Sequence, residues 1–377
     1  MTAAEALSRA SQVAEKILFP SALNVDAADR IPAGHLDALA EAGLYGLAGP
    51  VSAGGLDADL ATLCGVIEIM SGGCLATTFV WLQHHGAVRA LAASQNSVLR
   101  HRWLEPLCRG AKRAGIALGG VRPGPPLLRA RAVPGGYVLD GSAPWVTGWD
   151  MIDVVHTLAR DESGNLVAAL LTAEVSATLS ASRLELVAVN ASRTVELTFA
   201  DHFVPADLIT GVTPHAQWLA RDAGSLRTNG SLSLGVAGRC CRLLGQVAGQ
   251  ADQSPGGSGP LAAELEARRI ALDTPVLEGD GAPESGAASM PAARAAASAF
   301  AFQAAGLLVA AAGSHSILTG AHPQRLAREA LFLLVFGSRP AIKDHLVALL
   351  TARGADVRGT DVRGTDVCGT DVCDTAN

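Results

Sequence analysis

The sequence predicts an α+β protein made of three units. These are an all-helical N-terminal unit at residues 1–112, a middle β-barrel or β-sandwich at residues 113–211, and a C-terminal four-helix bundle at residues 212–353. In the first and third units, apolar residues recur every three or four positions, as they do on one face of a helix. In the middle unit, short β-rich runs alternate with Pro- and Gly-rich turns, as they do in small all-β units.

Five helices are predicted in the first unit. Pro32 fits the first turn of the second helix, where a missing N–H is tolerated. Asp57 or Asp59 can cap the third helix, whose apolar side chains keep a regular helical period as far as Met70. The predicted helices are residues 2–18, 32–44, 60–70, 77–93 and 97–108.

Seven strands are predicted in the middle unit. Turn signals such as Pro134-Gly135-Gly136 and Ser163-Gly164-Asn165 separate the apolar runs. The predicted strands are residues 115–121, 128–133, 137–139, 152–159, 166–172, 184–189 and 194–199.

Four long helices are predicted in the third unit, at residues 215–251, 261–276, 291–318 and 323–352. Their Ala-rich faces favour close packing, and one bundle packed on another predicts a homodimer or homotetramer. Residues 354–377 repeat Gly-Thr-Asp-Val with a period of five, which matches neither a helix nor a strand. We expect this tail to be disordered and without function.

The composition excludes several classes of protein. Net charge is −6 and no basic run is dense, so we expect no nucleic-acid partner. The longest apolar stretch, Phe300–Ala312, is shorter than the ~20 residues of a bilayer span, so we expect no membrane partner. The N-terminal residues lack the apolar core of a signal peptide, which predicts a cytoplasmic protein. The seven cysteines show no metal-ligand spacing, so we expect buried free thiols and no metal.

The segment Gly141–Asp150, GSAPWVTGWD, is the first candidate for a binding site. It lies between two predicted strands. An exposed Trp145 at the end of a strand offers a stacking face for a flat aromatic ligand. The hydroxyl of Thr147 and nearby backbone N–H groups offer hydrogen bonds to the polar edge of such a ligand.

The pattern Gly-x-x-x-Trp-Val-Thr-Gly in this segment resembles the flavin-contacting segment of the acyl-CoA dehydrogenase family, which usually reads Trp-Ile-Thr-Asn. Three other stretches agree in order: Gly54-Gly55, the strand-like run from Leu197 to Pro205, and Arg325-x-x-Arg328-Glu329-Ala330. The likeness covers roughly residues 5–350. It implies the same three-unit fold and a flavin-dependent oxidoreductase acting on an acyl-CoA or related acyl thioester.

The resemblance also implies which residues contact the flavin. Trp145, Val146, Thr147 and Gly148 match the family segment, and the backbone of Gly119 and Gly120 lies where the family has its other flavin loop. The implied cofactor is FAD, with Arg122 as a candidate phosphate contact. The family's pyrophosphate-binding Arg-x-x-Phe-Gly is absent, so FMN, or no flavin, is the alternative.

The catalytic base of the family is missing from the sequence. A dehydrogenase of this family removes the proton alpha to the thioester carbonyl with a Glu that precedes a Gly-Thr. The matching position here is Gly337, and the family's alternative base position is Thr228. Neither residue abstracts a carbon-bound proton. Glu329 is the nearest carboxylate along with Asp344, and we expect it to form an ion pair with an Arg of its own helix.

Two alternative functions therefore stand beside dehydrogenation. A related branch, the two-component flavin-dependent monooxygenases, shares the fold, lacks the Glu and often uses a His or Ser near the flavin. His84 and His85 are the candidates for that role. One of two adjacent helix residues usually faces solvent, so at most one of them is expected to face the site, and a structural role is the favoured interpretation of each. The other alternative is a catalytically inactive member that acts as a binding or structural subunit.

Overall fold

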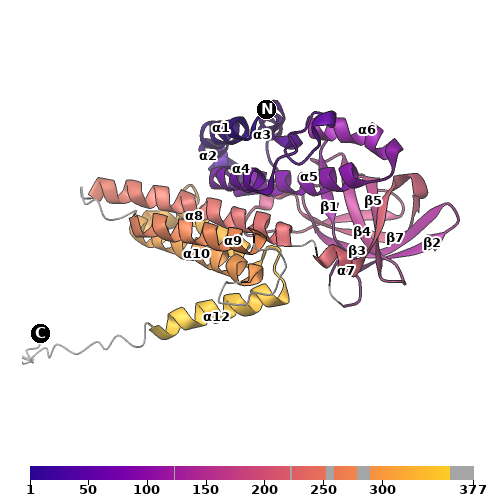
Figure 1. Cartoon of the computed structure of the whole chain (residues 1–377). Coiled ribbons are helices and arrows are strands. Elements are labelled where there is room, and N and C mark those ends of the chain that lie inside the picture. Colours follow the sequence, from indigo (N-terminus) through magenta and orange to yellow (C-terminus); the bar gives the residue numbers. More distant parts are fainter. Residues whose placement is uncertain (123, 221–222, 252–258, 278–288, 357–377) are drawn as a thin grey trace, which may run out of the picture.

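The computed structural model describes residues 1–122, 124–220, 223–251, 259–277 and 289–356 (Figure 1). The chain forms an N-terminal group of helices, a mixed β-sheet and a C-terminal group of helices, in the predicted order. Most of the residues between the predicted helices 215–251, 261–276 and 291–318, and the repeat tail beyond residue 356, lie outside the described residues.

The first predicted helix continues beyond residue 18. α1, Ala3–Val13, begins with a capping box, in which the Glu5 N–H donates to the Thr2 hydroxyl at 3.2 Å and the Thr2 N–H donates to the Glu5 carboxylate at 2.7 Å. A π-helical turn, Ala14–Leu18, joins α1 to α2, Phe19–Ala27. Both α1 and the π turn pack on α4, which extends the apolar contact between them.

The other N-terminal helices are α3 Ala33–Glu41, α4 Leu60–Gly73, α5 Leu75–Ala93 and α6 Ser97–Cys108. Of the two candidate caps, Asp59 is the one used, because its carboxylate accepts the N–H of Thr62 at 2.8 Å. α5 packs against strand β1 and, through Phe79, against α11. This helix therefore links all three parts of the molecule.

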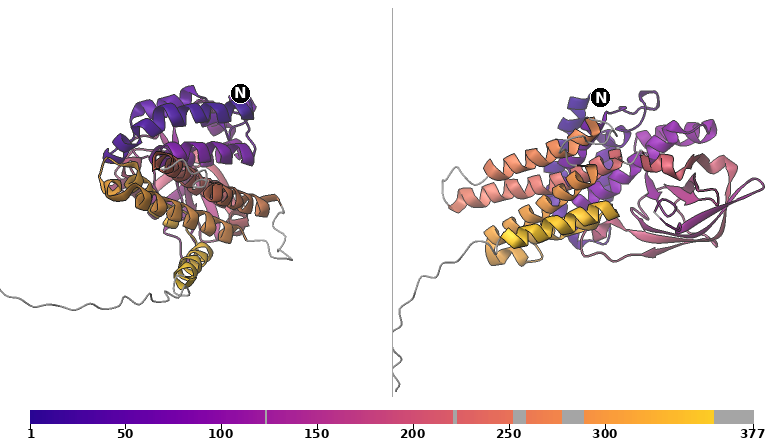
Figure 2. Two further views of the ribbon diagram at one scale, coloured as in Figure 1. Left: turned by 90° about the vertical axis from the view of Figure 1, so that its left-hand side faces the viewer. Right: turned by 60° about the horizontal axis from the view of Figure 1, so that its bottom comes forward.

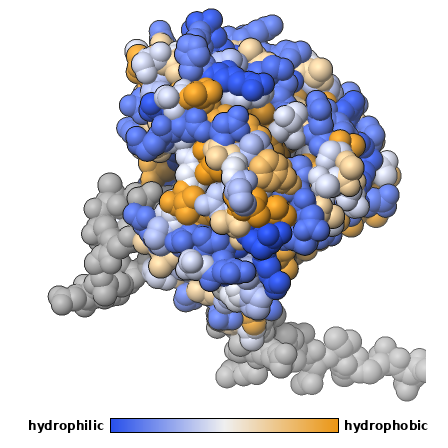
Figure 3. All heavy atoms as spheres, turned by 90° about the vertical axis from the view of Figure 1, so that its right-hand side faces the viewer, coloured by the Kyte–Doolittle hydropathy of each residue, from blue (hydrophilic) through white to orange (hydrophobic). Residues whose placement is uncertain are grey.

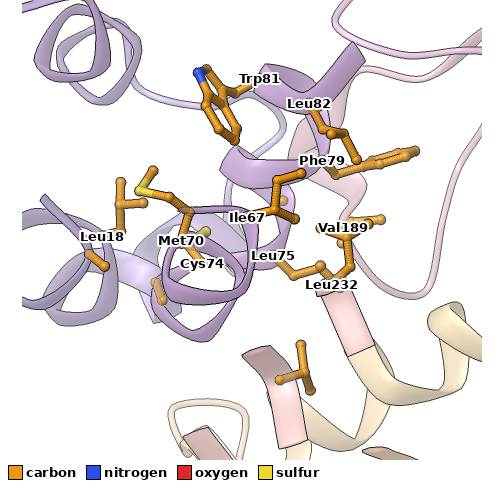
Figure 4. Packing of buried hydrophobic residues seen from close by; sticks show 14 of the residues in the cluster. Leu18, Ile67, Met70, Cys74, Leu75, Phe79, Trp81, Leu82, Val189 and Leu232 are labelled. Atoms are coloured by element: carbon orange, nitrogen blue, oxygen red, sulfur yellow. The ribbon is translucent and has the colours of Figure 1, made fainter. Parts of the chain in front are cut away.

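The largest hydrophobic cluster is shared by the two groups of helices. Figure 4 shows Ile67, Leu75 and Phe79 of α4 and α5 together with Leu232 of α8 and Val189 of the loop before β7. Complete burial of a side chain of this size contributes about 1.5–3 kcal/mol. The shared cluster fixes the position of α5 relative to the C-terminal helices.

The eight strands form one sheet in the order β6-β7-β3-β2-β4-β5-β8, with β1 pairing to β4. Pairing is antiparallel except for β1 and β2 with β4. On the sheet side of the molecule, apolar residues lie near the centre of a mixed surface (Figure 3). The strands are β1 Ala114–Ala117, β2 Leu128–Val133, β3 Gly136–Val146, β4 Val154–Arg160, β5 Asn165–Thr172, β6 Leu179–Arg183, β7 Val195–Pro205 and β8 Ile209–Pro214.

The strand predicted at residues 184–189 is wrong. Val189 has a left-handed φ of 51°, which is incompatible with a strand, and its side chain packs into the helical core. The strand that pairs with β7 is β6, which ends at Arg183, just before the predicted strand begins. β8 was not predicted, because Gly211 and Pro214 obscure its alternation. β3 is longer than the predicted 137–139 and carries Trp145 at its end.

The C-terminal helices are α7 His215–Ala220, α8 Ala223–Ala251, α9 Gly259–Leu277, α10 Met290–Ala312, α11 His322–Val335 and α12 Pro340–Asp356. The single helix predicted at residues 323–352 is wrong. Gly337, with a φ of 60°, follows the C-cap of α11, and Pro340 opens α12. α12 packs along α10, as Figures 1 and 2 show.

One helical segment in the described chain, Met290–Ile317, is long and apolar enough to cross a membrane by length and composition. It is longer than the stretch counted from the sequence because α10 begins ten residues before Phe300. Half of its most apolar window is buried within the protein, and α10 packs on α8, α11 and α12. Core helices of bundles commonly have this composition.

The five cysteines within the described residues are buried and unpaired, as predicted; they are Cys64, Cys74, Cys108, Cys240 and Cys241. Burial raises the pKa of the Cys108 thiol to about 11, which keeps it protonated and unreactive at neutral pH. Cys368 and Cys373 lie outside the described residues. No group of metal-ligating side chains occurs in the described part of the chain.

Candidate functional site

The segment Gly141–Asp150 presents one aromatic ring to solvent. The pairing of β3 with β7 shifts register between Ala143 and Val146, as in a β-bulge. Within this irregularity Trp145 adopts a φ of 64°, and its side chain is 54% exposed. A left-handed conformation is unfavourable for a bulky residue and must be held by its surroundings. The irregular strand end thus aims the indole outward, where a flat ligand can stack on it.

The other residues of this segment are bonded inside the protein. Val146 is fully buried in the core of the sheet. Thr147 is 2% exposed, and its hydroxyl lies 3.3 Å from that of Thr194. The N–H of Gly148 donates to the Ser192 carbonyl at 2.9 Å. Their hydrogen-bonding groups are therefore satisfied without a ligand.

The loop at Gly119 and Gly120 is held tightly against the sheet. A Cβ on Gly119 would lie 2.4 Å from the Ser142 carbonyl oxygen, so only glycine permits this approach. The N–H of Gly120 donates to the Leu158 carbonyl at 2.8 Å, and its own carbonyl accepts from Arg160 at 2.8 Å. The Gly120 N–H predicted to meet a ligand edge is therefore already used within the sheet.

Of the predicted flavin-contacting residues, Trp145 alone offers a free surface. An aromatic ring system can stack on its indole. The hydroxyl of Thr147 and the N–H groups of Gly120 and Gly148 are already bonded within the protein. In this conformation the residues fit a stacking contact but do not fit the hydrogen-bonded cradle that the sequence predicted.

The two predicted base positions lie together although they are far apart in the sequence. A side chain at Gly337 would place its first carbon 2.9 Å from Nδ2 of Asn229, which follows Thr228 on α8. Thr228 is 4% exposed, and its hydroxyl donates to the Ser225 carbonyl at 2.9 Å. None of these groups is a base at neutral pH.

One turn of α5 lies between the segment Gly141–Asp150 and the predicted base position at Gly337. The γ1 carbon of Val80 lies 3.1 Å from where a Cβ on Gly148 would be. The preceding residue, Phe79, packs edge-on against Phe336, with ring centroids 5.0 Å apart. Phe336 directly precedes Gly337. The strand-end segment and the α11–α12 turn therefore lie on neighbouring sides of the same short stretch of helix.

We call the place where the segment Gly141–Asp150, α5 and the α11–α12 turn meet the junction. Aromatic side chains form one wall of it. Phe79 also packs on Phe332 at 5.1 Å, and Phe332 stacks on Phe336 at 5.5 Å. Phe79 is buried, whereas the other two are half-buried. Such a wall suits an apolar chain.

A buried cation lies behind the aromatic wall. Arg294 of α10 is 1% exposed, and it donates to the Phe336 carbonyl at 3.3 Å and the Ser233 hydroxyl at 3.3 Å. Burial lowers the pKa of Arg294 to about 10, which leaves it charged at neutral pH. In the described part of the chain it forms no ion pair, so its charge is unneutralised beside the α11–α12 turn.

Comparison with known proteins relates the N-terminal domain and the fold of the chain to the acyl-CoA dehydrogenases. Residues 3–111 match the family model for the acyl-CoA dehydrogenase N-terminal domain. The mitochondrial short-chain specific acyl-CoA dehydrogenase of Bos taurus is 28% identical over 210 residues, which is 52% of this chain and 50% of the relative. Benzylmalonyl-CoA dehydrogenase of Aromatoleum aromaticum is 26% identical over 201 residues, 52% of this chain and 53% of the relative.

The chain is similar to the acyl-CoA dehydrogenases in its N-terminal domain and in its overall fold. The match spans about half the length of these curated relatives.

Solved structures show that the family fold extends over nearly the whole chain. Butyryl-CoA dehydrogenase from Megasphaera elsdenii superimposes with a TM-score of 0.77 and 18% identity, covering 94% of this chain and 98% of that one. The glutaryl-coenzyme A dehydrogenase in complex with glutaryl-CoA gives 0.79 at 18% identity, covering 93% and 95%. PigA with FAD and proline gives 0.77 at 18% identity, covering 93% and 98%. At these identities the likeness establishes the fold alone.

Of the two carboxylates nearest in sequence to Gly337, Glu329 is held in an ion pair. Glu329 and Arg325, one turn apart on α11, are both buried, and their side chains approach to 2.6 Å as predicted. Burial raises the pKa of Glu329, although Arg325 opposes the shift. The following Arg328 bonds to Asp26 of α2. Asp344 is exposed on α12. Neither carboxylate is placed as a substitute base.

Both histidine candidates lie in the protein core, which corrects the expectation that one of them faces solvent. His84 is 1% exposed and accepts the N–H of Ala114 on Nδ1 at 3.1 Å. His85 is fully buried edge-on against Trp81, with both ring nitrogens unpaired among the described residues. The cause of their burial is that α5 packs against β1 as well as against helices. They are core residues of α5.

Sequence reasoning missed Asn229 and Arg294. The signal for Asn229 was its position beside Thr228, because a residue next to a predicted base position shares its surroundings. Arg294 carried a different signal: it is a charged residue in an otherwise Ala-rich helix, Met290–Ala312. A lone charge on such a helix is rarely buried without a polar partner.

Proposed function

We propose that this protein is a flavin-dependent oxidoreductase that acts on an acyl-CoA or related acyl thioester, with FAD as its cofactor. Its similarity to the acyl-CoA dehydrogenases supports this function. The main supporting observation is a contact on each side of α5. Val80 contacts the segment Gly141–Asp150 at Gly148, and Phe79 contacts Phe336 next to Gly337. A stacking ring and an aromatic wall for an acyl chain are thereby brought to one junction.

The residues of this chain supply binding groups but no carboxylate base. Trp145 would stack on the flavin ring, and Phe79, Phe332 and Phe336 would contact the acyl chain. Gly337, Thr228 and Asn229 leave the α-proton of a saturated thioester without a general base, which is typically worth about 10²–10⁴-fold in rate. The proposed activity on saturated acyl-CoA is accordingly slow.

A second candidate is a catalytically inactive family member that binds a thioester without oxidising it. It is supported by the neutral residues at both base positions and by the internal hydrogen bonds of Gly120, Thr147 and Gly148. The monooxygenase alternative shares the fold that the resemblance implies, so the chemistry of the cofactor, and not the fold, would distinguish it from dehydrogenation.

Flavin binding is the first property to measure. We expect the purified protein to carry FAD, or to bind added FAD, with a visible absorption spectrum and release of the chromophore by acid. Replacing Trp145 by Ala removes the stacking face and is expected to weaken FAD binding roughly tenfold. Trp103→Ala on α6 is the matched control. A protein that binds neither oxidised nor reduced flavin would leave the inactive candidate in place.

We further propose that the protein is a homodimer or homotetramer joined through its C-terminal helices. Large apolar side chains are exposed along these helices, among them Phe302 at 39%, Val335 at 69% and Val347 at 57%. Apolar surface of this kind marks protein–protein contacts. Light scattering is expected to show an oligomer that Val335→Glu weakens, whereas Val51→Glu, at an equally exposed N-terminal site, has no effect. A monomeric wild-type protein would contradict this proposal.

A further inference from the structure

Gly337 is exposed and faces one polar group. Apart from its two chain neighbours, the described atoms within 4 Å of a Cβ built on Gly337 belong to the Asn229 carboxamide, with Nδ2 at 2.9 Å and Cγ at 3.8 Å. A glutamate at this position would fill the space with two methylenes and a carboxylate. Here that volume is left to a ligand.

The carboxamide of Asn229 is available to such a ligand. Asn229 is half-buried on α8, so its side chain is held by the fold yet reachable. Within the described part of the chain, no hydrogen bond involves its side chain. A half-buried amide without a partner gains a hydrogen bond when a ligand supplies an acceptor.

The charge around Asn229 favours an electron-rich ligand group. Arg294 is buried behind the turn and bonds the Phe336 carbonyl, and it has no acidic partner among the described residues. The remaining wall is formed by Phe79, Phe332 and Phe336 and offers no hydrogen bonds. An N–H donor in an apolar wall, with a positive charge behind it, selects an acceptor oxygen over a methylene.

We infer that Asn229 donates through Nδ2–H to an oxygen carried on the α-carbon of the acyl group, so that the preferred substrate class is a 2-hydroxyacyl thioester. The α-substituent occupies the volume that a glutamate at position 337 would fill. Asn229 is then the residue that determines specificity. This inference rests on the proposed function, because it requires an acyl thioester to bind at the junction.

The test is calorimetric titration of the full-length protein with two thioesters of equal chain length, butyryl-CoA and 2-hydroxybutyryl-CoA. We expect the hydroxylated thioester to bind about tenfold more tightly, the value of one additional hydrogen bond. Asn229→Ala is expected to abolish this preference while retaining butyryl-CoA binding. Asn229→Leu, which has a similar size but no hydrogen-bonding group, is expected to abolish it as well. Thr351→Ala, on the exposed side of α12, is the control.

The outcomes separate the inference from the proposed function. If wild-type protein binds the two thioesters equally, or if Asn229→Ala keeps the preference, the role of Asn229 is overturned and the thioester-binding function stands. If neither thioester binds to the wild-type protein, both are overturned. Circular dichroism of each variant shows whether a lost preference comes from the site or from unfolding.

Discussion

Replacing Gly337 by Glu together with Asn229 by Gly is expected to accelerate removal of the α-proton of butyryl-CoA by about 10²–10⁴-fold, the usual contribution of a positioned general base. The double replacement is needed because a side chain at position 337 begins 2.9 Å from Nδ2 of Asn229. Removing that amide clears the path for the carboxylate. The left-handed φ of 60° at Gly337 costs a non-glycine residue roughly 1 kcal/mol, which most folds tolerate.

Exchange of the α-proton for deuterium measures this gain without an electron acceptor. Butyryl-CoA is incubated with each protein in D₂O, and the mass increase is followed by mass spectrometry. Gly337→Gln with Asn229→Gly is the matched control, because glutamine has the shape of glutamate and no basic oxygen. The single variant Gly337→Glu is expected to gain much less than the double variant. Equal exchange rates for the Glu and Gln double variants would show that the turn does not face the acyl group.

The fold could be predicted from the sequence because its longest elements have strong local patterns. α6 was predicted with its observed bounds, and Asp59 was one of two named caps. Errors arose where tertiary contacts override local pattern. The apolar run ending at Val189 looks like a strand, yet its side chains satisfy the helical core. β8 has a weak pattern and forms because β5 is available for pairing.

The candidate site was predictable only in part, because its properties depend on distant neighbours. The sequence identifies Trp145 as an aromatic residue at the end of a strand. It also shows that position 337, where the family has its catalytic Glu, is a glycine. It does not show that the Gly120 N–H already bonds to Leu158, or that Asn229 faces Gly337. These contacts join different elements of the chain. Periodicity carries information within an element, but not about which elements meet.

The buried histidines predict a marked loss of stability in mild acid. Burial lowers the pKa of His84 to about 3 and the pKa of His156 to about 4, and it lowers the pKa of His85 well below its usual value. Burial and nearby arginines lower the pKa of His322 to about 4. In the unfolded chain the pKa of each of these histidines is about 6.5. Below that pH the unfolded chain binds more protons than the folded protein, so stability falls as pH falls and levels off only near the folded pKa values.

The size of this effect makes it measurable by urea unfolding. At pH 5.0 each of the three fully buried histidines, His84, His85 and His156, removes roughly 2 kcal/mol relative to pH 7.5, and together they approach the ~5–15 kcal/mol that stabilises an ordinary domain. His322 is only partly buried, so solvent screening makes its contribution smaller. We therefore expect the urea midpoint, followed by circular dichroism, to drop sharply between these two pH values. A midpoint that stays constant would mean that His84, His85 and His156 are not buried as neutral groups.

His85 provides the most selective test of this explanation. Its ring nitrogens have no partner among the described residues, so His85→Leu removes an ionisable group without breaking a hydrogen bond. We expect the variant to match or exceed the wild-type stability at pH 7.5. Below pH 6.5 its dependence on pH is expected to be shallower by about 1.4 kcal/mol per pH unit, the contribution of one proton. His101→Gln, at an exposed position on α6, is the control and should retain the full wild-type slope. The same slope in both variants would place the acid-sensitive group elsewhere in the core.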